Sequence, residues 1–76
     1  MDKIPGRVRI GGVWYNAVKG FNKIELQDHL RREIYTLIEP YAHMRDFYHV
    51  LNSDGRKVGE IHMDNKMFEG VVEAFE

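Results

Sequence analysis

The apolar and polar positions alternate near the start of the chain, and this alternation predicts a β-hairpin. Residues 7–18 contain two runs rich in β-branched and aromatic residues on either side of Gly11-Gly12, a pair that suits a two-residue hairpin turn. Pairing across this turn places one alternating set on the core face: Val8, Ile10, Val13 and Tyr15. The opposite face, which we call the first-hairpin face, receives the other set: Arg7, Arg9, Trp14 and Asn16.

The apolar period lengthens to three or four residues over 22–39, and this change predicts an amphipathic helix. Asn22 and Glu25 have the spacing of a capping box, and Phe21 just before them fits a hydrophobic staple. One apolar stripe would face the core: Leu26, Leu30, Ile34, Leu37 and Ile38. Outside this stripe lies a small amphipathic area formed by Ile24, Arg31 and Tyr35, and we call its predicted contact residues, Arg31 and Tyr35, the helix-flank patch.

A second hairpin is predicted over residues 45–63, with Asp54-Gly55 as its turn. This register places His49 opposite Glu60, with His62 diagonal to His49 on the same face. A bulged three-residue loop is a common alternative at such turns, so the pairs nearest the turn are open.

The last segment, residues 64–76, allows two predictions. The spacing of its apolar residues fits a short helix, whereas the β-branched pair Val71-Val72 favours a strand over 68–75. The chain is therefore predicted to be one α+β domain over residues 1–76, in the order β-β-α-β-β followed by a short α or β. A small antiparallel sheet of two hairpins, packed against the amphipathic helix, would bury both apolar surfaces in two layers.

Composition restricts the chemistry that this chain can perform. Its 76 residues are 43% hydrophobic and include no cysteine, which excludes disulfides, thiolate zinc sites and thiol catalysis. The apolar runs are too short to span a bilayer, and the first six residues lack the order of a signal peptide. We therefore expect a soluble cytoplasmic protein with no membrane partner. No glycine-rich phosphate loop is present, and no cofactor is expected.

The formal net charge of −1 hides an uneven distribution along the chain. Residues 1–23 carry five basic side chains and one acidic side chain, whereas residues 46–76 carry three basic and seven acidic side chains. If the two segments lie apart, the molecule has a basic side and an acidic side. If strands from both ends of the chain are neighbours, their charges neutralise each other.

The first-hairpin face is the strongest candidate for a binding surface, and it has three interpretations. Trp14 could stack on nucleic-acid bases while Arg7 and Arg9 hold phosphates. The same residue types dominate the centres of protein interfaces. A local cation–π pair between Arg9 and Trp14 would instead shield the ring on an ordinary surface. The slightly acidic chain has no further basic cluster, which counts against nucleic acid.

Two further groups of residues were considered for catalysis or metal binding. His49, Glu60 and His62 could contribute metal ligands, but their spacing matches no metal motif and a cross-strand His–Glu pair explains them better, so no metal is expected. Ser53 lies at a predicted hairpin turn and Thr36 inside the predicted helix, so neither has the surroundings of a nucleophile. The sequence therefore predicts that this protein is not an enzyme.

These patterns together predict a small binding protein. We expect a stand-alone accessory, regulatory or inhibitory protein that acts by stoichiometric interaction with a protein partner. The first-hairpin face and the helix-flank patch are its predicted contact surfaces. A homodimer is a further expectation, because a small core gains from association and the oppositely charged ends favour antiparallel pairing. The alternative function is a nucleic-acid-binding module that uses the first hairpin.

Overall fold

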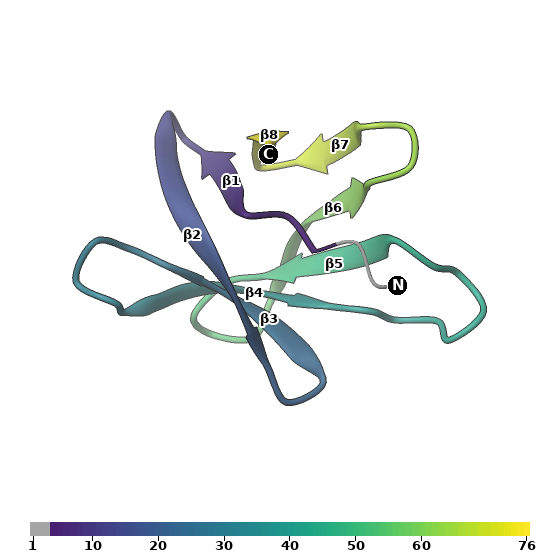
Figure 1. Ribbon diagram of the computed structural model, residues 1–76, viewed down its shortest axis with the longest axis horizontal. Helices are drawn as coiled ribbons and strands as arrows, with labels where there is room; N and C mark the ends of the chain where they lie inside the picture. Colours follow the sequence, from purple (N-terminus) through teal and green to yellow (C-terminus); the bar gives the residue numbers. More distant parts are fainter. Residues whose placement is uncertain (1–3) are drawn as a thin grey trace.

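The computed structural model describes residues 4–76, which form eight antiparallel strands in a nearly closed barrel (Figure 1). In chain order the strands are β1 Arg7–Ile10, β2 Val13–Gly20, β3 Lys23–Gln27, β4 Glu33–Ile38, β5 Phe47–Leu51, β6 Lys57–His62, β7 Met67–Gly70 and β8 Val72–Phe75. Their order in the sheet is β7-β6-β5-β4-β3-β2-β1-β8, so β1 to β7 follow one another in the sheet as they do in the chain, and β8 pairs with β1. The described part of the chain has no helix of the length and apolarity that crossing a membrane requires.

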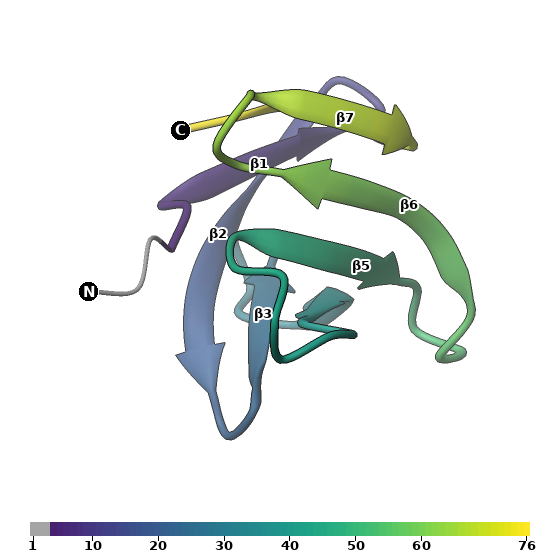
Figure 2. The same ribbon diagram turned by 90° about the vertical axis from the view of Figure 1, so that its right-hand side faces the viewer.

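The C-terminal segment closes the barrel. β7 pairs with β6, and after a bend at Gly70 and Val71 the chain continues as β8, which pairs with β1. The backbone N–H of Glu76 donates a hydrogen bond of 2.9 Å to the carbonyl of Arg7 and extends this pairing. β7 and the C-terminal end of the chain lie at the top of the barrel in Figure 2, and β8 between them is paired with β1.

The core fills the interior of the barrel. Most strands contribute alternate residues to it, as expected when every second side chain points inward. The buried set is Val8, Ile10, Ile24, Leu26, Leu37, Tyr48, Val50, Ile61, Met63 and Val72. β2 contributes the partly buried Tyr15 and Ala17, and β7 is exposed along its whole length. The stability of this domain therefore depends on one layer of inward-facing side chains held by the closed sheet.

The first hairpin has the predicted register. Arg7 pairs with Asn16 and Arg9 with Trp14, and the intervening residues also pair as predicted. Gly11 and Gly12 have φ angles of 59° and 77°, which a primed two-residue turn requires. One of the four predicted core residues differs: Val13 is half exposed, because it lies next to the turn at the rim of the barrel.

The predicted α+β fold is wrong, because residues 22–39 form β3 and β4 instead of an amphipathic helix. Leu26 and Leu37 belong to both the helical stripe and the strand alternation, and both are fully buried. Leu30 distinguishes the two arrangements, since a helix would bury it, and it is 61% exposed in the β3–β4 loop. Pairing with a neighbouring strand on each side, together with the β-branched and aromatic residues of β4, outweighs the local helical pattern.

Polar residues of the predicted helix form turns. Asn22, predicted as the helix cap, lies in the two-residue β2–β3 turn with a φ of 58°, a conformation that asparagine tolerates. Asp28 shapes the β3–β4 loop, because its Oδ1 accepts hydrogen bonds of 2.9 Å from the backbone N–H groups of Leu30 and Arg32. Its Oδ2 accepts a further bond of 2.8 Å from Arg32 Nε.

We expect Asp28→Asn to lower the melting temperature at neutral pH, with a smaller difference from wild type in acid. The hydrogen bond from the Arg32 backbone, followed by the bonds from the Arg32 side chain and the Leu30 backbone, holds the pKa of Asp28 below its ordinary value of about 3.9. Such a carboxylate stabilises the fold above its unfolded pKa, and this stabilisation disappears as the pH falls through the lower folded pKa. Thermal denaturation of both proteins from about pH 7 to about pH 2 measures this effect. A difference in melting temperature that stays constant over this range would contradict it.

The second half of the chain confirms the predicted pairing of the second hairpin away from its loop, and it decides between the two predictions for the C-terminal segment. The second hairpin has the predicted pairing between His49 and Glu60, and a bulge shifts Leu51 to pair with Lys57 near the loop. The predicted C-terminal helix is wrong, and the strand alternative over residues 68–75 is confirmed with a bend that divides it into β7 and β8. The fold is therefore all-β over the described residues.

Candidate functional site

The first-hairpin face is assembled as predicted on the outer side of β1 and β2. The guanidinium carbon of Arg7 lies 4.7 Å from the centroid of the Trp14 ring, and that of Arg9 lies 5.8 Å from it. Both distances fall within the range of cation–π contacts. Asn16 is exposed beside Arg7 in the neighbouring strand. The predicted cation–π contact of Trp14 is confirmed, and it involves both arginines.

Carboxylates from the C-terminal end of the chain neutralise this face. Arg7 forms an ion pair with Glu76, and Arg9 Nε lies 2.9 Å from Glu73 Oε2 in a contact that lacks the alignment of a hydrogen bond. Glu73 also accepts a hydrogen bond of 3.1 Å from the backbone N–H of Gly12 in the turn. Of the two predicted charge arrangements, neutralisation between neighbouring end strands is the one found here. A nucleic-acid phosphate would have to displace a carboxylate from each arginine.

The helix-flank patch was predicted wrongly, because it required a helix. Tyr35 lies in β4 and packs against the core, where its ring meets that of Tyr15 edge to face at 5.6 Å and 77°. Burial, followed by the nearby Tyr35 and Asp28, raises the pKa of Tyr15, which therefore stays neutral at physiological pH. Arg31 lies in the exposed β3–β4 loop with a φ of 62°. The two residues do not share the predicted surface.

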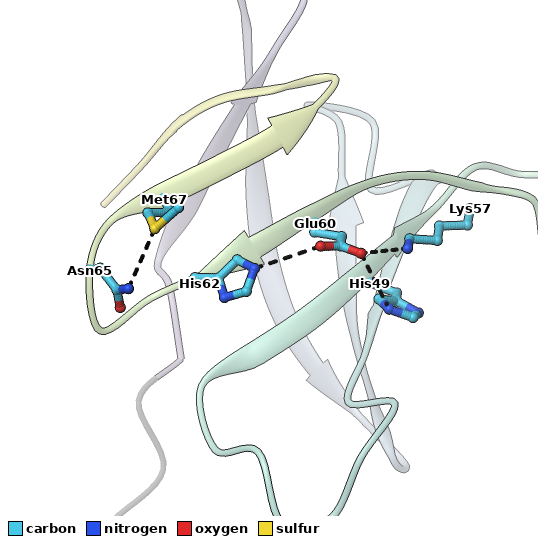
Figure 3. Close-up of polar contacts among 6 residues, drawn as sticks. All are labelled: His49, Lys57, Glu60, His62, Asn65 and Met67. Carbon is cyan, nitrogen blue, oxygen red and sulfur yellow. Dashed lines mark hydrogen bonds and ion pairs between the residues drawn. The ribbon is translucent and has the colours of Figure 1, made fainter.

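The predicted histidine–glutamate group is brought together on the outer face of β5 and β6 (Figure 3). His49 Nε2 lies 3.7 Å from Glu60 Oε1, and His62 Nε2 lies 3.6 Å from Glu60 Oε2. A hydrogen bond from Lys57, followed by the nearby histidines, lowers the pKa of Glu60 and keeps it ionised. Among residues 4–76, no three His, Cys, Asp or Glu side chains form a group that could hold a metal ion. The geometry is that of cross-strand polar pairs centred on one carboxylate.

An aromatic cluster beside this group was missed by the sequence analysis. Phe47 is only 7% exposed although it points away from the barrel interior. Tyr41 stacks on it at 6.2 Å with ring planes 1° apart, and His62 lies 4.3 Å from its centroid. The segment between β4 and β5 is thereby held against the barrel wall. The available signal was the aromatic Phe47 on the same face of the predicted hairpin as His49, Glu60 and His62.

The β2–β3 turn carries the most exposed large apolar side chain among the described residues. Phe21 is 90% exposed, and the turn that carries it projects from the bottom of the barrel in both views (Figures 1 and 2). The turn is short, because Gly20 pairs directly with Lys23. The sequence predicted that Phe21 forms a hydrophobic staple. This role requires the predicted helix, and residues 22–39 form strands instead. Nothing within the described chain covers this ring.

A cleft of about 600 Å³ lies directly beside the Phe21 turn. Its lining comes from the β2–β3 hairpin, including Lys19, and from Glu39 just after β4 and the segment that follows it. Its apolar lining includes three core residues, Ile24, Leu37 and Tyr48. Because these segments are far apart in the sequence, no local pattern could have predicted the cleft.

Lys23 connects the rim of this cleft with two carboxylates on the outer face of β3 and β4. Its Nζ lies 3.6 Å from Glu25 Oε1 and 3.4 Å from Glu33 Oε2. A hydrogen bond between the two carboxyl groups raises the pKa of Glu25 and lowers that of Glu33. The Thr36 hydroxyl donates a bond of 2.6 Å to Glu33 Oε1. These contacts orient Lys23 at the base of the hairpin that carries Phe21.

Comparison with protein-family models, with curated proteins and with solved structures finds no match to this chain. The functional surface therefore has to be identified from the structure alone. The structure offers the first-hairpin face, whose arginines are already paired, and the Phe21 turn beside the cleft, where the Phe21 ring faces solvent.

Proposed function

We propose that this chain is a non-catalytic binding protein that acts by stoichiometric interaction with a protein partner, with Phe21 as its anchor. The observation that carries the proposal is the 90% exposure of Phe21 at the end of a projecting hairpin. Burying such a side chain is worth about 1.5–3 kcal/mol relative to leaving it in water. A pocket on a partner recovers this free energy. Because a two-residue turn holds the ring, little conformational freedom is lost on binding.

The surroundings of Phe21 support a protein partner over a nucleic acid. The lining of the adjoining cleft includes apolar residues and charges of both signs, namely Lys19, Lys23 and Glu39. Protein surfaces that bind nucleic acid carry a basic patch, whereas protein–protein interfaces have an apolar centre and a polar rim. An intracellular accessory or regulatory role stays a prediction of the sequence.

Replacing Phe21 with alanine is expected to abolish partner capture without changing the melting temperature. Truncating an aromatic anchor costs about 2 kcal/mol or more of binding free energy, which weakens binding roughly 30-fold. Immobilised wild-type and variant proteins would be compared for the proteins they retain from an extract of the source organism. Leu30→Ala is the matched control, because Leu30 is also exposed and lies in the loop at the other end of β3.

Two outcomes would contradict this function. Equal retention of every captured protein by wild type and Phe21→Ala would remove Phe21 as the anchor. Salt-sensitive binding of oligonucleotides that Trp14→Ala abolishes and Phe21→Ala preserves would instead assign the function to the first-hairpin face and to nucleic acid.

A further inference from the structure

We propose that Arg9 is a recognition site for a carboxylate from an acidic segment of a protein partner, and that Glu73 occupies this site as an autoinhibitory contact until that segment displaces it. The site belongs to the first-hairpin face, where Arg9 pairs with Trp14 near the start of β2, whereas Phe21 follows the end of β2. It is therefore a second site that goes beyond the proposed function and does not depend on Phe21.

Glu73 covers Arg9 without satisfying it. Arg9 Nε lies 2.9 Å from Glu73 Oε2, yet its N–H forms no hydrogen bond with any described residue, and the atom is almost completely shielded from solvent. A covered donor without an acceptor raises the free energy of the folded state, because it has lost water and gained no bond. A carboxylate aligned with this N–H would remove that cost.

The position of Glu73 in β8 accounts for this incomplete contact. Arg9 pairs with Ala74 and Ile10 pairs with Val72, which leaves Glu73 as the extra residue of a β-bulge. Such bulges redirect a side chain and occur frequently beside functional sites. The backbone N–H of Gly12 donates to both carboxylate oxygens of Glu73, at 3.1 and 3.2 Å. The carboxylate of Glu73 is therefore bound by the turn and can keep this bond when another carboxylate binds Arg9.

Arg7 shows how the same face satisfies an arginine completely. Its Nε and Nη2 both donate to Oε2 of Glu76, and its guanidinium carbon lies 4.7 Å from the centroid of the Trp14 ring. The Arg9 guanidinium lies farther from this ring, at 5.8 Å, and its side chain is 43% exposed. Arg9 is thus the arginine that a ligand can reach and whose hydrogen bonding a ligand can complete.

The chemistry of the face favours a carboxylate from a protein over a phosphate. A guanidinium binds a carboxylate through two parallel hydrogen bonds, and carboxylates already lie against both arginines. Glu73 and Glu76 stay beside the site, and they repel a phosphate of about −1.5 to −2 charge more strongly than a singly charged carboxylate. Trp14 adds apolar surface, and arginine and tryptophan are enriched at the centres of protein interfaces. An acidic segment of a protein fits these properties.

Titration of the whole chain with a hexaglutamate peptide tests the site. Trp14 is the only tryptophan of the chain, so its fluorescence reports directly on this face. We expect a saturable change in fluorescence with hexaglutamate and none with the neutral peptide hexaglutamine. Arg9→Ala should weaken binding at least about tenfold. Arg9→Lys should also weaken it, because lysine keeps the charge but lacks the paired donors of the guanidinium.

Glu73→Gln makes the test specific to the autoinhibitory contact, because it is expected to strengthen binding. The substitution removes the competing charge, while the amide oxygen of glutamine can still accept the hydrogen bond from Gly12. Exposed ion pairs of this kind are weak, so we expect hexaglutamate to bind about two- to fivefold more tightly. A gain in affinity cannot come from unfolding, and circular dichroism would confirm the wild-type fold of each variant.

The other outcomes overturn the inference or separate it from the proposed function. An equal response to hexaglutamate and hexaglutamine, or weaker binding by Glu73→Gln, would overturn it. Tighter binding of a phosphoserine peptide or an oligonucleotide, with the same dependence on Arg9, would assign the site to phosphate and also overturn it. Phe21→Ala should bind hexaglutamate as wild type does. If Phe21→Ala retains every captured protein, the proposed function of Phe21 fails while the hexaglutamate result stands.

Discussion

Gly70→Ala is expected to lower the free energy of unfolding by at least about 3 kcal/mol, a large fraction of the about 5–15 kcal/mol that stabilises a typical domain. Gly70 has a φ of 85°, where a side chain is strained by about 1–3 kcal/mol. Its added Cβ would also lie 2.3 Å from the carbonyl oxygen of Val58 and 2.6 Å from Cα of Gly59. Both are backbone atoms of β6, so relief of the contact would disturb the pairing that leads into the closing bend. Urea and thermal denaturation followed by circular dichroism measure the loss.

Two other glycines separate the causes of this expected loss. Gly55 has a similar φ of 81° but open space around its Cβ position, so Gly55→Ala should show the backbone strain alone. Gly59 has no positive φ, yet its Cβ would lie 2.6 Å from the carbonyl oxygen of Glu69, so Gly59→Ala should show the close approach alone. If Gly70→Ala were no worse than Gly55→Ala, β6 and β7 would not approach as closely as described.

The register of both hairpins could be predicted from the sequence because it depends on neighbouring residues. Turn chemistry at Gly11-Gly12 and alternation along β1 and β2 are sufficient to align that hairpin. Closure of the barrel depends instead on β1 pairing with β8, whose residues are more than 60 positions away. Local patterns contain no information on such a pairing. The position of Gly70, where the last segment bends after β7 and continues to its pairing with β1, therefore could not be predicted.

The candidate surfaces also differ in whether they depend on neighbouring residues or on residues far apart in the sequence. Alternation within hairpins was enough to predict that Arg7, Arg9 and Trp14 meet on one face, and that His49 meets Glu60. The carboxylates that neutralise the arginines come from β8 and the C-terminal end. The sequence therefore predicted that acidic residues could neutralise this face, but it did not identify them. The Phe21 turn was hidden by the predicted helix, and the cleft beside it is formed by segments that only the folded barrel brings together.

Leu26→Ala is expected to destabilise the protein by about 2–5 kcal/mol, whereas Leu30→Ala should change its stability by less than about 0.5 kcal/mol. Leu26 is fully buried inside the barrel, and its truncation removes apolar contacts and leaves a cavity. Leu30 is 61% exposed in the β3–β4 loop, so its truncation removes few contacts. Urea denaturation midpoints of the two variants, measured beside wild type, give both values.

This comparison tests the strand arrangement directly, because Leu26 and Leu30 are one helical turn apart. In an amphipathic helix over 22–39 both would face the core, and their truncations would cost similar amounts. In the barrel they separate, since the strand ends at Gln27 and the loop carries Leu30 away from the core. Comparable losses from the two substitutions would therefore contradict the β3–β4 hairpin. They would also remove the β2–β3 turn that presents Phe21, and with it the physical basis of the proposed binding function.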